Sequence, residues 1–164
     1  MGMRIVIMGN SGSGKTSMAR RLGAAGGIAC LCLDDIAWYA GVSRRPIDQS
    51  LADLQRFITE HPRWIIEGCY GELIEAALPF ADELHFLNPG IEFCVQNCRN
   101  RPWEPQKFAS PQEQQQMLKA LIAWVGQYET RTDEFGLARH LRIYEQFTRP
   151  KRQYSASDLR TMAG

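Results

Sequence analysis

The chain has 164 residues, 45% of them hydrophobic, and its formal net charge at pH 7 is +1. This length fits one domain and the hydrophobic share is enough to build a core, which excludes a disordered or fibrous protein. The small net charge gives no reason to expect a nucleic-acid partner, and no apolar run is long enough to span a membrane.

The cysteine count and the N-terminus narrow the class further. Five cysteines is an odd number, without the dense and even framework of a small secreted protein, so we expect reduced thiols. No Cys or His pair completes the spacing of a zinc site, so we expect no structural metal. The segment from Met1 to Met8 is too short for the core of a signal peptide. We therefore expect a cytoplasmic protein with a single domain, residues 1–164.

Strand and helix patterns alternate along the chain. In order, we predict a strand at 3–8, a helix at 15–22, a strand at 28–33, a helix from 50, a strand at 63–67, a helix at 71–78, a strand at 83–87, a helix from 88 to about 99, a helix from 110 to about 135, a strand at 141–144 and a last helix from 155. Strands without a clean apolar/polar alternation, separated by helices, are typical of an α/β fold whose parallel sheet is covered on both faces. Such a sheet binds ligands at the carboxyl ends of its strands.

Several helix ends carry residues that are typical of caps. Three predicted helices begin with a serine that is followed three residues later by an acidic side chain: Ser50 with Asp53, Ser110 with Glu113, and Ser155 with Asp158. Asn88-Pro89 supplies an N-cap and a first-turn proline for the helix that ends near Arg99. Gly136 is expected to end the long helix that starts at Ser110.

Residues 9–16, Gly-Asn-Ser-Gly-Ser-Gly-Lys-Thr, match the phosphate-binding loop (P-loop) pattern at every fixed position, after a strand and before a helix. Glycines let the backbone N–H groups point inward, and these amides form an anion nest with the positive end of the following helix. The candidate nucleotide contacts are Gly9, Asn10, Ser11, Gly12, Ser13, Gly14, Lys15, Thr16 and Ser17. Lys15 is expected to reach the β- and γ-phosphates, and the Thr16 hydroxyl to bind Mg²⁺.

Acidic side chains follow two of the predicted strands. Asp34 and Asp35 come after the second strand and Glu67 ends the third, so these carboxylates should emerge at the same sheet edge as the P-loop. Phosphoryl transfer needs one carboxylate near Mg²⁺ and another that orients the acceptor hydroxyl or takes its proton. Glu67 is the candidate for the metal. Asp34 is the candidate for the acceptor, with Asp35 as the alternative.

The chain resembles the nucleoside-monophosphate kinase branch of the P-loop phosphotransferases, which includes adenylate and shikimate kinases, over almost its whole length. The resemblance is carried by GNSGSGKT, LDD after the second strand, WIIEGCYG at the third, and HFLNP followed by QNCRNR. Within this branch the chain is most similar to the adenylate-kinase-related DNA-topology-modulation (FlaR-type) proteins, through Leu33-Asp34, Trp64 to Ile66, Gly68-x-Tyr70-Gly71 and Trp124 to Arg131.

This resemblance implies a three-layer fold with a five-stranded parallel sheet of order 2-3-1-4-5, a mobile acceptor region after strand two, and a lid after strand four at about 100–135. It implies that Arg99 and Arg101 begin the lid and neutralise charge on the transferring phosphoryl group. It also implies adenine contacts at 148–152, including Arg149, with a basic surface loop as the alternative. Arg131 is either a third phosphate contact or part of an ion pair.

Departures from the family pattern limit what the resemblance says about the acceptor. Nucleoside-monophosphate kinases carry an arginine in Asp-Gly-x-Pro-Arg that grips the acceptor phosphate, and residues 67–71 have no arginine, so an AMP-like acceptor is not expected. Shikimate kinases show two aspartates separated by one residue and a Gly triplet, which this chain does not have. Trp38, Tyr39 and Tyr70 either line an acceptor pocket or are half-buried core aromatics. The histidines are expected to be structural.

Taken together, these patterns predict an ATP- and Mg²⁺-dependent kinase for a small-molecule acceptor, with Lys15, Arg99 and Arg101 stabilising the transferring group and Asp34 orienting the acceptor. The alternative is a nucleotide-binding regulatory protein or a slow ATPase that has no small-molecule acceptor. This alternative includes a protein whose function is linked to DNA. The near-zero net charge and the lack of a recognisable DNA-reading motif argue against a nucleic-acid partner.

Overall fold

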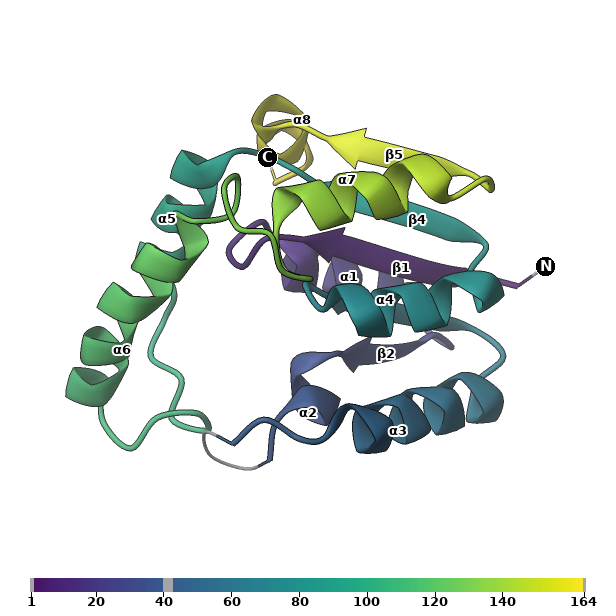
Figure 1. The fold of residues 1–164 in the computed structure, drawn as a ribbon, viewed down its shortest axis with the longest axis horizontal. Helices are drawn as coiled ribbons and strands as arrows, with labels where there is room; N and C mark the ends of the chain where they lie inside the picture. Colours follow the sequence, from purple (N-terminus) through teal and green to yellow (C-terminus); the bar gives the residue numbers. More distant parts are fainter. Residues whose placement is uncertain (1, 40–42, 164) are drawn as a thin grey trace.

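The computed structural model describes residues 2–39 and 43–163, which build one five-stranded sheet in the order β2-β3-β1-β4-β5 (Figure 1). The strands are β1 (Arg4–Gly9), β2 (Ala29–Cys32), β3 (Trp64–Gly68), β4 (Glu83–Leu87) and β5 (Lys151–Tyr154). Every neighbouring pair is parallel. The α/β class and the predicted strand order are confirmed.

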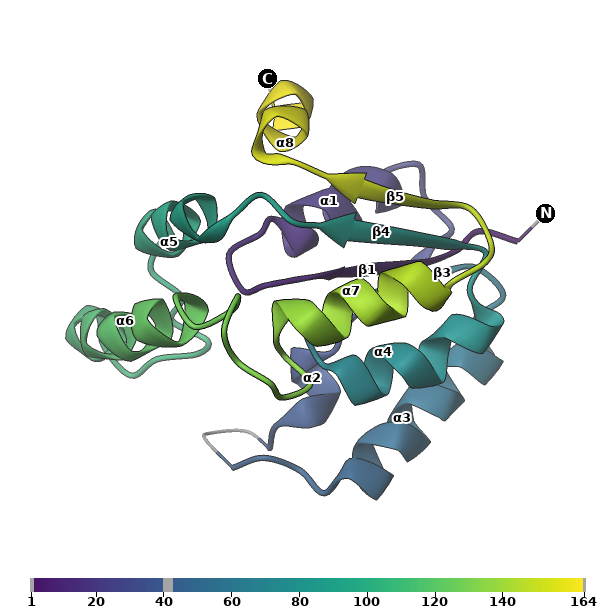
Figure 2. The same ribbon diagram turned by 45° about the horizontal axis from the view of Figure 1, so that its top comes forward.

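Helices cover both faces of this sheet. They are α1 (Lys15–Gly23), α2 (Asp34–Ala37), α3 (Ile47–Glu60), α4 (Gly71–Ala77) with the 3₁₀ turn η1 (Leu78–Phe80), α5 (Ile91–Arg99), α6 (Pro111–Val125), α7 (Leu137–Gln146) and α8 (Ala156–Ala163). Helices α3, α4 and α7 lie on one face of the sheet and α1 on the other (Figures 1 and 2). Apolar residues of α3, α4 and α7 form one core with the sheet, and those of α1 and α8 form a second core on the other face. Within the described residues, no helix combines the length and the apolar character needed to cross a membrane.

The central strand β1 contributes to both cores because successive side chains of a strand point to opposite faces. Val6 and Met8 pack with the α3, α4 and α7 side, whereas Ile5 and Ile7 pack with the α1 and α8 side. All four side chains are at most 3% exposed. The P-loop therefore follows a strand that is held from both sides.

The strand register brings the carboxyl ends of three strands together. Met8 of β1 pairs with Gly68 of β3, and Cys32 of β2 pairs with Glu67 of β3. The segments that follow β1, β2 and β3 consequently start side by side at one edge of the sheet. This edge carries the P-loop, Asp34 and the loop after Glu67.

The predicted fifth strand is wrong. Residues 141–144 belong to α7, and the strand is Lys151–Tyr154. Helix α7 buries His140 and Ile143 and packs further apolar side chains at helical spacing against the sheet. In the edge strand β5 only Tyr154 is buried, so it lacks the apolar run that marks the other strands.

Three predicted helix starts and ends also differ from the structure. Helix α3 begins at Ile47, and Ser50 lies buried inside it and donates its hydroxyl to the carbonyl oxygen of Ile36 at 2.7 Å. Helix α5 begins at Ile91 after Gly90, whose φ is 98°, so Asn88-Pro89 lies outside it. The long helix is interrupted, because α6 ends at Val125 and residue 136 precedes α7.

Two predicted caps are confirmed. The Ser110 hydroxyl accepts from the backbone N–H of Glu113 at 3.1 Å, and the Glu113 carboxylate accepts from the backbone N–H of Ala109. The Ser155 hydroxyl accepts from the backbone N–H of Asp158 at 3.2 Å, and the Asp158 carboxylate accepts from the backbone N–H of Ser155 at 2.8 Å. Both pairs satisfy N–H groups that a helix start leaves without partners.

Candidate functional site

The loop between β1 and α1 has the backbone of an anion cradle. Gly12 and Gly14 take φ angles of 82° and 97°, in the left-handed region that favours glycine. Gly12 also touches α5: a Cβ atom there would lie 2.3 Å from the carbonyl oxygen of Cys94 and 2.9 Å from Sγ of Cys98. The glycine therefore serves both the conformation of the loop and its close approach to α5.

Lys15 lies across this loop at the start of α1. Its ammonium group donates to the carbonyl oxygen of Asn10 at 2.7 Å, and the residue is 9% exposed. Asn10 is buried and donates its side-chain amide to the carbonyl oxygen of Val125, at the end of α6, at 3.2 Å. The lysine charge is thus held inside the loop, where phosphate oxygens would be bound.

Thr16 and Glu67 present two oxygen atoms side by side. The Thr16 hydroxyl donates to Oε1 of Glu67 at 3.2 Å, and Glu67 is 5% exposed. Oxygen donors of this kind suit Mg²⁺, which is usually held by one or two protein oxygens together with substrate phosphates and water. Within the described residues, no group of three or more His, Cys, Asp or Glu side chains could hold a metal by itself. This pair fits a Mg²⁺ that arrives with a nucleotide.

Within the described part of the chain, the cysteines belong to no group of three or more side chains that could hold a metal ion. All five are free. Burial raises the pKa of Cys69 to about 12 and that of Cys94 to about 12, so both stay protonated at neutral pH. Thiols that are not ionised are poor metal ligands.

Asp34 stands at the start of α2 in a chain of three side chains. The Trp38 indole can only donate, so its N–H at 2.8 Å makes the Tyr70 hydroxyl an acceptor, and the hydroxyl proton is directed to Oδ1 of Asp34. Burial and the nearby Asp34 raise the pKa of Tyr70 above its ordinary value, which keeps that proton on the hydroxyl. Tyr70 is 4% exposed, whereas Trp38 is 41% exposed. Asp34 therefore has one carboxylate oxygen in a fixed hydrogen bond.

The other two residues of the predicted acceptor region lie differently. Asp35 is exposed next to Asp34 and, within the described residues, its side chain forms no hydrogen bond or ion pair in the structure. Tyr39 is 47% exposed and donates its hydroxyl to Gln49 of α3 at 2.8 Å. Of these aromatic residues, Trp38 and Tyr70 are the ones linked to a candidate catalytic carboxylate.

Helix α5 and the residues after it contact the P-loop directly. Asn97 donates its side-chain amide to the carbonyl oxygen of Gly12 at 2.8 Å, and Arg101 donates to Oγ of Ser11 at 3.2 Å. Arg101 thus lies beside the P-loop, and its role in stabilising charge stays a prediction. The sequence patterns do not single out Asn97, whose position becomes evident only from the packing of α5 on the loop.

Arg99 lies elsewhere, in a pocket of about 590 Å³ between α5 and α8. The lining includes Phe93 and Asn97 of α5 and Arg160 of α8, whose guanidinium lies 5.7 Å from the centre of the Phe93 ring. Because Asn97 also contacts Gly12, this pocket borders the P-loop. Arg160 is a further candidate nucleotide contact that the sequence patterns do not indicate.

Arg149 is not near the P-loop. The expectation of adenine contacts at 148–152 rests on a fifth strand at 141–144, but β5 starts at Lys151, so Arg149 precedes the strand. Its guanidinium donates to the carbonyl oxygen of Leu78 at 2.5 Å and lies 5.0 Å from the Phe147 ring centre. Leu78 belongs to the turn that leads into β4, at the opposite edge of the sheet.

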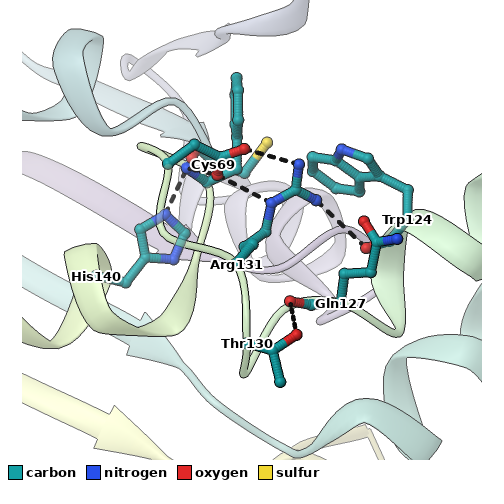
Figure 3. A network of polar contacts seen from close by, with 8 residues as sticks. Cys69, Trp124, Gln127, Thr130, Arg131 and His140 are labelled. Carbon is teal, nitrogen blue, oxygen red and sulfur yellow. Dashed lines mark hydrogen bonds and ion pairs between the residues drawn. The ribbon is translucent and has the colours of Figure 1, made fainter.

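Arg131 forms an ion pair, one of the two alternatives that the sequence leaves open. Its guanidinium donates twice to Asp133, at 2.9 and 2.8 Å, and once to the carbonyl oxygen of Trp124 at 3.3 Å (Figure 3). It lies 4.3 Å from the centre of a Trp124 ring. The predicted long helix does not continue through residues 126–136, so Arg131 stands in the irregular segment between α6 and α7.

A buried histidine holds the loop that follows β3 (Figure 3). His140 contacts the carbonyl oxygen of Cys69 through Nε2 at 3.0 Å and the Tyr128 hydroxyl through Nδ1 at 2.7 Å. A carbonyl oxygen only accepts, so Nε2 carries the proton and Nδ1 accepts from Tyr128. Burial lowers the pKa of His140 to about 4, so the ring is neutral at pH 7. Cys69 stands between Glu67 and Tyr70, and this network fixes the loop that presents both.

Comparisons with known proteins place the fold. No family model and no curated protein matches the chain, so the resemblance to the DNA-topology-modulation group stays a prediction. The structure is similar to a gluconokinase from Sinorhizobium meliloti, with a TM-score of 0.53 and 19% identity over 94% of this chain and 83% of that one. It is also similar to an unliganded sugar kinase from a Janibacter species, with a TM-score of 0.51 and 14% identity over 96% of this chain and 87% of that one. At such identities the likeness shows a shared fold, and that fold is the P-loop kinase fold.

Proposed function

We propose that the protein is a kinase that transfers the γ-phosphoryl group of ATP to a small-molecule acceptor. The observation that carries the proposal is the convergence of the P-loop, the Thr16–Glu67 pair and Asp34 at one edge of the sheet. Phosphoryl transfer depends mainly on positioning and charge stabilisation, which these groups can supply. The names of the two similar structures, a gluconokinase and a sugar kinase, support the same reaction class.

In this proposal the P-loop amides and the Lys15 ammonium bind the phosphates, with the lysine exchanging the Asn10 carbonyl for phosphate oxygens. Mg²⁺ bound at Thr16 and Glu67 would neutralise charge on those oxygens. The nucleotide base would occupy the pocket between α5 and α8, against Phe93 and Arg160. Arg101 is the arginine that faces the transferring group, and Arg99 contributes to the base pocket.

Asp34 orients the acceptor. Its Oδ1 accepts from Tyr70, which leaves Oδ2 to accept a hydrogen bond from the acceptor hydroxyl. The hydroxyl oxygen attacks the γ-phosphorus of ATP, its proton passes to the carboxylate or to water, and ADP leaves. Trp38 and Tyr70 fix the carboxylate before the acceptor arrives, which lowers the cost of positioning it.

The direct test is a screen of sugars, sugar acids, nucleosides and other small metabolites, first by thermal shift in the presence of Mg²⁺ and ADP, then by ADP formation from ATP. An acceptor should raise the unfolding temperature by mass action and should also raise ADP formation. Lys15→Ala should abolish the nucleotide-dependent part of both signals while its circular dichroism spectrum stays that of the parent. ADP formation that no compound raises above the slow background would favour the regulatory or slow-ATPase alternative.

A further inference from the structure

Arg44 is fixed beside the candidate acceptor site by the backbone of the segment that follows Asp34. The backbone N–H of Arg45 donates to the carbonyl oxygen of Ala37, and that of Tyr39 to the carbonyl oxygen of Ser43, both at 2.9 Å. Trp38 and Arg44 face each other in an antiparallel bridge. The backbone on either side of Arg44 is thus hydrogen-bonded to the short segment that contains Trp38, and Trp38 in turn is linked to Asp34 through Tyr70.

Three aromatic rings from three segments surround the Arg44 guanidinium. Its central carbon lies 4.7 Å from the Tyr70 ring centre, 5.8 Å from that of Trp38 and 6.0 Å from that of Phe135. These rings come from the loop after β3, the residues after α2 and the turn before α7. Phe135 and Tyr70 also contact each other edge to face, at 5.4 Å between ring centres. Ring faces attract a guanidinium and hold its plane without using its N–H donors.

Within the described part of the chain, no acidic side chain forms an ion pair with Arg44. Residues 40–42, which lie outside the described part, are Ala-Gly-Val and have no acidic side chain. Three other half-buried arginines are each paired with a carboxylate: Arg45 with Asp53, Arg131 with Asp133, and Arg139 with Glu75. Among the described residues, Nε of Arg44 is buried without a hydrogen-bond partner.

A half-buried cation whose N–H donors have no partner destabilises the folded protein unless an anion pairs with it. The Tyr70 ring under Arg44 is the one whose hydroxyl holds Asp34, so such an anion would lie on the acceptor side of the site. Asp34 itself is engaged with Tyr70 through Oδ1. The arrangement therefore combines a carboxylate that suits a hydroxyl group with a guanidinium that suits a negative charge.

We infer that Arg44 binds an anionic group of the acceptor, a phosphate or a carboxylate, with the rings of Tyr70, Trp38 and Phe135 against the apolar part of the same molecule. The inference rests on the proposed kinase function and narrows its acceptor to acidic small molecules. The planar guanidinium matches both anions with two parallel N–H donors.

The test uses the full chain saturated with Mg²⁺ and a non-hydrolysable ATP analogue, so that phosphate sites of the P-loop are filled. Phenyl phosphate, benzoate and phenol are then titrated by calorimetry. In the parent protein at least one of the two anions should bind about ten- to hundredfold more tightly than phenol, as expected for hydrogen bonds to a charged group. Whichever anion binds more tightly identifies the phosphate or the carboxylate as the preferred group.

Arg44→Gln should remove that preference for anions and leave the affinity for phenol. Arg44→Lys, which keeps the charge without the planar fork, should bind the anions with intermediate affinity and covers the case in which the glutamine variant fails to fold. Arg56→Gln makes the same charge change at a side chain that is 64% exposed on α3, and should bind the anions like the parent. Anion affinity that is the same in Arg44→Gln and the parent, or a parent that binds phenol as tightly as the anions, would overturn the inference.

Failure of the proposed function gives a different result. In that case no compound of the metabolite screen raises ADP formation above the slow background, whether or not the parent binds the ATP analogue. The anion titration is therefore repeated on the Lys15→Ala protein without nucleotide. A preference for anions that depends on Arg44 still supports the inference. The absence of such a preference counts against the inference.

Discussion

The Thr16 hydroxyl donates a hydrogen bond to the Glu67 carboxylate at 3.2 Å, which joins the end of the P-loop to the end of β3. The two residues are 51 positions apart in the sequence, yet they form the pair of oxygen donors that suits Mg²⁺. The pairing depends on the register of β1 and β3, in which Met8 lies beside Gly68.

Glu67→Gln should raise the Mg²⁺ concentration needed for half-maximal ADP formation by about tenfold or more, because a neutral amide is a weaker ligand for a hard cation than a carboxylate. A Mg²⁺ titration at fixed ATP measures this. Glu60→Gln, which makes the same charge change at the exposed end of α3, should leave the midpoint unchanged. Equal midpoints for the parent and Glu67→Gln would remove Glu67 from the metal site.

Tyr70→Phe should lower the kcat for acceptor phosphorylation by about ten- to hundredfold, because Asp34 loses the hydrogen bond to its charged oxygen that holds it in place. The KM for ATP should change much less, since within the described residues the Tyr70 hydroxyl bonds to Trp38 and Asp34 and not to the P-loop. Steady-state kinetics with the acceptor found in the screen separates the two effects.

Tyr39→Phe is the matched control for this prediction. It removes a hydroxyl from the neighbouring exposed aromatic residue, which bonds to Gln49 rather than to Asp34. A loss of kcat in Tyr39→Phe as large as in Tyr70→Phe would show that the Tyr70 hydroxyl has no special role.

Gly12→Ala should destabilise the protein and weaken nucleotide binding, because its Cβ would lie 2.3 Å from the backbone oxygen of Cys94 and its φ is 82°. Gly26→Ala is a control with nearly the same φ, 80°, and open space around its Cβ, so it should cost only the backbone strain of about 1–2 kcal/mol. Chemical denaturation gives both free energies of unfolding. The excess loss in Gly12→Ala measures the contact between the P-loop and α5, and the absence of any excess would argue against that contact.

The free energy of unfolding should fall as the pH drops from about 6.5 towards 4. In this window the unfolded His140 binds a proton, whereas the folded one, with a pKa of about 4, does not. The unfolded state therefore binds more protons, which lowers stability at up to about 1.4 kcal/mol per pH unit. Denaturant unfolding at a series of pH values measures the slope.

His140→Gln should flatten that slope, because glutamine can still donate to the Cys69 carbonyl oxygen but does not titrate. Identical slopes for the parent and His140→Gln would show that the pKa of His140 is the same in the folded and unfolded states.

Sequence patterns predict most of this sheet and miss one strand for a physical reason. The first four strands are short and mostly apolar, and β1, β3 and β4 are largely buried, which a single sequence reveals. Strand β5 lies at the sheet edge with only Tyr154 buried, while the apolar residues of the short helix α7 resemble a strand. The wrong strand in turn put Arg149 at the wrong edge of the sheet.

The same contrast holds for the site. The P-loop and the carboxylates at Asp34 and Glu67 are predictable, because loop chemistry and strand ends are local properties of the chain. The roles that we propose for Arg44, Asn97 and Arg160 depend on how distant segments pack, as where α5 contacts Gly12 or where three aromatic rings surround the Arg44 guanidinium. No spacing in the sequence signals such contacts.

The hydrogen bond between the Asn10 side chain and the Val125 carbonyl oxygen ties the far end of α6 to the interior of the P-loop. If α6 swings outward, this end must either act as the pivot or pull on the backbone that grips the phosphates. Release of ADP and tilting of α6 would then be coupled. A fluorescent probe attached near the start of α6 could therefore follow each catalytic cycle.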